Sequence, residues 1–150
     1  TVRQRLNRNE AFAEAVDAVD PAALDVDALL AAAGAEIIAG DAGDPIVYVH
    51  TLTPTAVIRP VAELLDAATV ELVLGCTWRA VAALVSTYRR PRVGARTADR
   101  DIDAADVVDR AVSSGDEHAI KVAEAAFGPD SSDAPTVRAA AATLIARLSG

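Results

Sequence analysis

The two side chains best suited to chemistry are His50 and Cys76, each of which ends an apolar segment of the chain. A thiolate is a strong nucleophile, and a neighbouring imidazole can act as the base that generates it. We expect the two residues to end neighbouring strands, about 5 Å apart in the strand-pairing direction. The simpler interpretation is a small buried cysteine and a hydrogen-bonded histidine.

Threonine and arginine side chains near this pair indicate an anion site. Hydroxyl and guanidinium groups can bind phosphate or carboxylate, and a helix N-terminus adds free backbone N–H groups. The predicted ligand-binding residues are His50, Thr51, Thr53, Thr55, Arg59, Cys76, Thr77 and Arg79. The alternative is ordinary helix capping by Thr53, Thr55 and Thr77, because threonine is a common N-cap.

A cluster of arginines forms a second candidate site within an otherwise acidic chain. Its members are Arg89, Arg90, Arg92, Arg96 and Arg100. Such a patch can hold phosphate, nucleic acid or an acidic partner. The alternative is a solvated loop whose arginines pair with Asp101, Asp103 and Asp106. Few aromatic side chains lie nearby to stack on bases, so we do not expect a nucleic-acid partner.

Two strands with a helix between them are expected to position these residues. Ile46–Leu52 is β-branched and aromatic and lies between prolines, which predicts a buried strand. The helix after it is expected to start near Arg59, because Pro60 disfavours a helix interior. Thr69–Cys76 keeps helical spacing with the residues that follow, but its glycine favours a break. We therefore predict a second, parallel strand here, followed by a helix.

The chain is therefore predicted to have an α/β fold with a small, mostly parallel sheet of about three strands. The third strand is expected at Ala35–Gly40, after an N-terminal helix over residues 1–20 and a second helix that ends at Gly34. Apolar stripes and breaks at Gly115 and Gly128 predict a helical C-terminal third. We expect one domain, with helices over residues 1–33, an α/β core over 35–96 and helices over 101–150.

Composition limits the partners and the source. The chain has 22 acidic and 14 basic residues, a net charge of −8, and 52% hydrophobic but only 3% aromatic residues. Excess acid with a single lysine, Lys121, is typical of a halophilic archaeon with a GC-rich genome, and it argues against a whole-surface nucleic-acid binder. A core rich in alanine packs thinly, so a homo-oligomer would add buried area.

No cofactor, metal or membrane is predicted. A single cysteine allows neither an internal disulfide nor a zinc cluster, and no nucleotide-binding or metalloprotease motif is present. No targeting segment is evident and no apolar run approaches the ~20 residues that span a bilayer, so we expect a cytoplasmic protein.

Three functions remain from the sequence. We expect most a regulatory domain that binds a small anionic ligand beyond the strand ends. The alternatives are an interaction module that docks a partner through the Arg89–Arg100 patch or the C-terminal helices, and an enzyme that uses Cys76 and His50 on a phosphorylated or carboxylated substrate. The sequence leaves open whether the protein is an enzyme.

Overall fold

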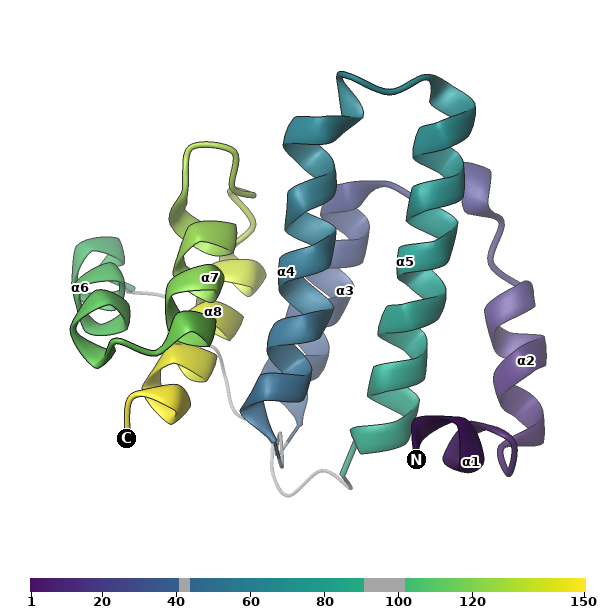
Figure 1. Ribbon diagram of the computed structural model, residues 1–150, viewed down its shortest axis with the longest axis horizontal. Helices are drawn as coiled ribbons and strands as arrows, with labels where there is room; N and C mark the ends of the chain where they lie inside the picture. The colour runs from purple at the N-terminus through teal and green to yellow at the C-terminus, as the bar shows by residue number, and fades with distance from the viewer. Residues whose placement is uncertain (41–43, 91–101) are drawn as a thin grey trace.

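The computed structural model describes residues 1–40, 44–90 and 102–150, and every regular element in these ranges is helical (Figure 1). The α-helices are α1 (Val2–Leu6), α2 (Glu10–Asp17), α3 (Val26–Ala39), α4 (Pro45–Ala62), α5 (Ala67–Tyr88), α6 (Ala104–Ser114), α7 (Glu117–Phe127) and α8 (Pro135–Leu148). A single 3-10 turn, η1, spans Pro21–Ala23. The predicted α/β fold with a parallel sheet is therefore wrong.

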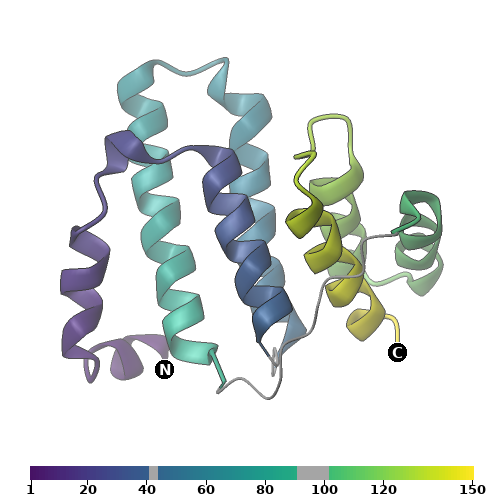
Figure 2. The ribbon, with the colours of Figure 1, turned by 180° about the vertical axis from the view of Figure 1, so that it is seen from behind.

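Helix α4 lies at the centre of the packing, because it contacts α3, α5, α7 and α8, and it forms a long hairpin with α5. In Figure 1, α3 lies behind this hairpin, α6, α7 and α8 lie on one side, and α1 and α2 lie on the other. Figure 2 shows α8 beside α3 from the opposite direction. The six largest fully buried side chains come from α3, α4 and α8 and are Tyr48, Leu30, Ile37, Leu52, Leu144 and Ile145.

Helix α4 contains Ile46–Leu52, the clearest predicted strand. The Asp44 carboxylate accepts a hydrogen bond from the Ile46 N–H at 3.1 Å, and Pro45 occupies the first turn, where its fixed φ suits a helix. The buried side chains of α4 are Tyr48, Val49, Thr51, Leu52, Thr55 and Ile58. Their spacing places one helical face against the core, and that burial outweighs the β-propensity of the segment. The helix also continues through Pro54 and Pro60, so a start near Arg59 is wrong.

Helix α5 runs without interruption through Thr69–Cys76, the second predicted strand. Its N-cap is Asp66, whose carboxylate accepts a hydrogen bond from the Thr69 N–H at 2.9 Å. Gly75 is buried inside the helix, and a Cβ there would lie 3.4 Å from the Cβ of Pro21. Gly75 therefore packs against η1 at ordinary contact distance and does not break the helix. With both strands absent, the ligand site at their ends is absent as well.

Helix α3 continues past Gly34, which the sequence predicts to be its end. A Cβ at Gly34 would lie 3.1 Å from the backbone oxygen of Thr136, so the missing side chain allows α8 to pack closely on α3. The predicted edge strand Ala35–Gly40 is instead the last turn of α3 and its cap.

The helices predicted near the two ends of the chain agree better with the structure than those predicted in the middle. The single helix predicted over residues 1–20 is divided at Asn7–Asn9 into α1 and α2. The helical C-terminal third is confirmed by α6, α7 and α8. Gly115 ends α6 with a φ of 65°, a left-handed conformation that glycine adopts without steric cost.

Helix α5 is also the one helix of the described ranges that could cross a membrane by length and composition. The sequence prediction missed this apolar run because it divided the segment at Gly75. Only 17% of the most apolar window of α5 is buried. A single helix of this length and composition is weak evidence, so this property alone does not place α5 in a bilayer.

Candidate functional site

The structure does not provide the strand edge that was expected to bring His50 and Cys76 together. His50 is exposed on α4 and Cys76 is exposed on α5. The His50 ring contacts the His118 ring of α7 edge to face, with centroids 6.0 Å apart. His118 Nδ1 in turn lies 3.4 Å from Asp116 Oδ1. The side chain that His50 contacts is therefore another histidine, His118, and not Cys76.

The three threonines predicted to hold an anion bond to their own helix. The hydroxyls of Thr51, Thr53 and Thr55 donate to the carbonyl oxygens of Tyr48, Val49 and Thr51 at 2.7, 3.0 and 3.1 Å. Thr51 and Thr55 are buried. These donors are already occupied by backbone oxygens. Thr77 is half-buried in the middle of α5, far from a helix N-terminus.

The arginine Arg59 joins helices instead of facing an open site. Its guanidinium donates to the Asp27 carboxylate of α3, which also accepts a hydrogen bond from the Ser132 hydroxyl at 2.8 Å. These hydrogen bonds, first from Arg59 and then from Ser132, lower the pKa of Asp27. The contact connects α3, α4 and the segment before α8.

The other predicted arginines are distributed over separate places. Arg79 lies 3.9 Å from Asp17, and Arg89 Nε lies 3.2 Å from Glu36 Oε2. Arg90 is exposed, whereas Arg92, Arg96 and Arg100 lie outside the described residues.

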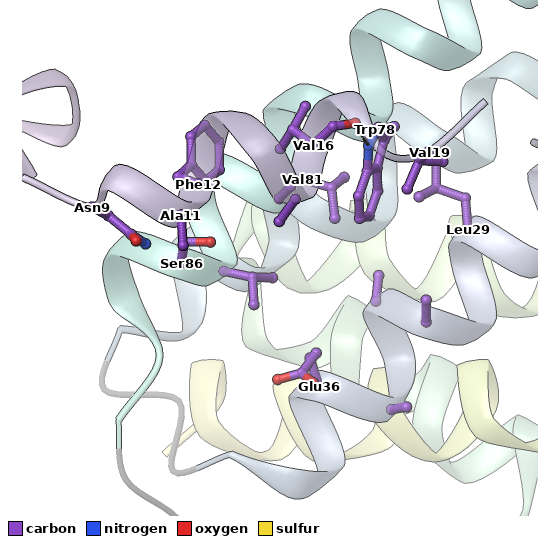
Figure 3. Close-up of a pocket in the computed structure, with 16 residues that line it drawn as sticks. Asn9, Ala11, Phe12, Val16, Val19, Leu29, Glu36, Trp78, Val81 and Ser86 are labelled. Atoms are coloured by element: carbon purple, nitrogen blue, oxygen red, sulfur yellow. Dashed lines mark hydrogen bonds between the residues drawn. The ribbon is translucent and has the colours of Figure 1, made fainter. Parts of the chain in front are cut away.

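A cleft between α2, α3 and α5 is a candidate ligand site (Figure 3). Its volume is about 590 Å³, within the range of small-molecule sites. The residues that line it are Asn9, Ala11, Phe12, Ala15, Val16, Val19, Leu29, Ala32, Ala33, Ala35, Glu36, Trp78, Val81, Ala82, Val85 and Ser86.

Short side chains explain why the cleft is hollow. Six of its lining residues are alanines, drawn from all three helices. An alanine side chain ends at Cβ, so neighbouring helices leave space between them unless a larger side chain on the opposite helix fills it. Here the larger side chains, such as Phe12 and Trp78, form walls and leave the centre open (Figure 3).

Helix α2 forms the outer wall of the cleft and is tied to α5 by one side-chain hydrogen bond. Trp78 Nε1 donates to the carbonyl oxygen of Val16 at 3.3 Å. Val16 is the one buried residue of α2, while Phe12 and Val19 are half-buried toward the cleft. A wall with so little buried surface can move more easily than the core helices.

Polar groups are few in the cleft. Figure 3 shows the Asn9 amide and the Ser86 hydroxyl toward one end, with Trp78 and Leu29 toward the other. The third polar group, Glu36, is ion-paired with Arg89. Outside the cleft lining, burial raises the pKa of the Tyr48 hydroxyl, and the negative charge of Glu36 raises it further. The cleft therefore offers an apolar body and neutral hydrogen-bonding groups at one end.

Sequence reasoning missed this cleft although it identified part of one wall. The apolar stripe containing Phe12, Val16 and Val19 is readable from helical spacing. The other walls depend on an unbroken α5 and an extended α3, neither of which was predicted. Within residues 1–40, 44–90 and 102–150, no three His, Cys, Asp or Glu side chains are close enough to hold a metal ion.

Comparisons with family models, curated proteins and solved structures found no match to this chain.

Proposed function

We propose that this protein binds a small, neutral, largely apolar molecule in the cleft between α2, α3 and α5. The observation that supports this proposal is a cavity of about 590 Å³ with apolar walls and few polar groups. The proposal concerns a different place and a different ligand chemistry from the anion site expected at strand ends.

The lining defines the class of ligand. Phe12, Val16 and Val81 offer apolar contact, and the Trp78 ring offers a flat surface for a ring or an extended chain. At the polar end, Asn9 and Ser86 can donate and accept hydrogen bonds without adding charge. An uncharged molecule with a hydroxyl, ester or amide at one end matches this distribution.

Titration with the neutral fluorophore N-phenyl-1-naphthylamine tests the proposal. The fluorophore should bind saturably, and it should quench Trp78, the single tryptophan of the chain, by energy transfer. Ala82→Phe fills the cleft and should weaken binding at least about tenfold, which corresponds to about 1.4 kcal/mol. Ala80→Phe is the control, because Ala80 is exposed on the same helix and does not line the cleft. Equal binding by wild type and Ala82→Phe would refute the proposal.

We further propose that the protein acts in the cytoplasm and that α5 is not a membrane span. Arg79 lies near the middle of α5 and is exposed. An arginine at the centre of a spanning helix costs about 2.5–3.5 kcal/mol on insertion scales. Recovery of the expressed protein in the membrane pellet after a carbonate wash would contradict this location.

A further inference from the structure

A second apolar depression, between α4, α5 and α7, shares no lining residue with the cleft. Its volume is about 950 Å³, and we call it the α4–α5–α7 groove. The residues that line it are Thr53, Pro54, Ala56, Val57, Ile58, Pro60, Val61, Leu65, Val73, Thr77, Ile120, Lys121, Glu124, Ala125 and Asp130. Large apolar side chains are exposed along it, among them Val57, Val61, Leu65 and Ile120. Contiguous exposed apolar surfaces are found at protein–protein and membrane interfaces and in ligand-binding grooves.

The charge around the groove is acidic. Three of its lining residues are charged, and the basic one, Lys121, donates to Glu117 Oε2 at 3.0 Å, which offsets its charge. Glu124 and Asp130 are exposed acids on the same wall. The whole chain carries a net charge of −8, so two copies repel each other. Charge therefore favours a basic partner over a second copy of this chain.

The form of the partner follows from what lines the groove. Strand addition requires an exposed sheet edge, and the described part of the chain has no sheet. Proline-rich peptides bind between aromatic side chains, and none of the lining residues is aromatic. A groove formed by helices with apolar walls suits an amphipathic helix whose apolar side chains recur every three to four residues.

We propose that the α4–α5–α7 groove docks an amphipathic helix of another protein, with its apolar face against Val57, Val61 and Ile120. Lysine or arginine residues beside that face would lie near Glu124 and Asp130. This arrangement combines apolar burial with charge complementarity, which sets specificity and speeds association.

Fluorescence anisotropy with labelled synthetic helical peptides tests this proposal. One probe carries leucines at helical spacing with lysine flanks, a second has the same leucines with glutamate flanks, and a third has the lysine composition with scrambled leucines. The lysine-flanked peptide should bind most tightly, and the other two should bind at least about tenfold more weakly. Equal binding of the lysine-flanked and scrambled peptides would overturn the proposal.

Substitutions in the protein locate the binding surface. Val57→Asp should abolish binding of the lysine-flanked peptide. Val112→Asp on α6 is a matched control and should leave it unchanged, because Val57 and Val112 are both 62% exposed and only Val57 lines the groove. Glu124→Lys should weaken the lysine-flanked peptide and strengthen the glutamate-flanked one. Circular dichroism establishes that each variant folds.

Sedimentation of the protein alone tests whether a second copy of this chain occupies the groove instead. A monomer at working concentrations supports a heterologous partner. A wild-type dimer that Val57→Asp dissociates and Val112→Asp does not would show that a second copy covers the groove, and it would overturn the proposal.

Discussion

Trp78 Nε1 donates a hydrogen bond to the carbonyl oxygen of Val16, 3.3 Å away, across the end of the cleft between α2 and α5. The bond joins residues 62 positions apart in the sequence. It fixes the outer wall of the proposed ligand site against the helix that forms its inner wall. Helix α2 is held against α5 by this bond together with the burial of Val16 and the Arg79–Asp17 ion pair.

Trp78→Phe should loosen α2 while keeping most of the aromatic wall. The substitution removes one hydrogen bond, worth about 1 kcal/mol, and leaves the ring contact in place. Hydrogen exchange of the α2 amides should become several times faster, while exchange in α8 stays the same. Unchanged protection of residues 10–17 would show that α2 is held by other contacts.

Pro60→Ala should stabilise the protein by about 1–3 kcal/mol. A proline inside a helix removes a backbone hydrogen bond and clashes with the preceding turn, and Pro60 lies inside α4. Pro45→Ala is the control and should not stabilise, because Pro45 occupies the first turn, where proline is favoured. Urea denaturation gives the free energy of unfolding of both variants. If Pro60→Ala lowers the free energy of unfolding, the helical assignment of this segment loses its support.

The Asp27 contact predicts how stability depends on pH. Hydrogen bonds from Arg59 and Ser132 hold the pKa of Asp27 below its usual range, so folding favours the ionised carboxylate. The resulting contribution to the free energy of unfolding is present above the unfolded pKa of about 3.9. It is lost as the pH falls through the lower pKa of the folded state. Because the side chain is 59% exposed, solvent screening limits it to less than about 1 kcal/mol.

Two variants isolate that contribution. Asp27→Asn should be less stable than wild type at neutral pH, and the difference should shrink as the pH falls below about 4. Ser132→Ala removes one donor to the carboxylate and should show part of the same effect. The measurement is urea denaturation at several pH values. A difference that stays constant down to the lowest pH would contradict the role given to Asp27.

Salt should raise the melting temperature of the protein. A net charge of −8 destabilises the compact state through self-repulsion, and salt screens that repulsion. A double variant, Glu10→Gln with Asp130→Asn, removes two exposed acids and should respond less steeply. Thermal melts over a range of sodium chloride concentrations give both slopes. A melting temperature independent of salt would weigh against the halophilic source predicted from composition.

The sequence predicts helices well where a local residue ends them. Gly115 and the pair Gly128–Pro129 mark the ends of α6 and α7, because these residues cannot easily continue a helix. It predicts poorly where a local preference is outweighed by burial. Ile46–Leu52 favours a strand locally, yet the helical face containing Tyr48 and Leu52 is fully buried.

Glycines and alanines explain why the site was missed. In the sequence Gly34 resembles a helix end and Gly75 a break after a strand, but each lies inside a helix where another segment passes closely. That close approach is a tertiary contact, which no local pattern records. The cleft likewise depends on alanines of three helices facing one another, and the sequence of a single helix cannot show that relationship.

Nuclear Overhauser contacts between bound N-phenyl-1-naphthylamine and labelled methyl groups test the central proposal most directly. The fluorophore should contact the methyl groups of Val16, Val81 and Val85, which line the cleft. Contacts to Val57 and Ile120, which line the separate groove, would contradict the proposed site, and so would the absence of any methyl contact at saturating fluorophore.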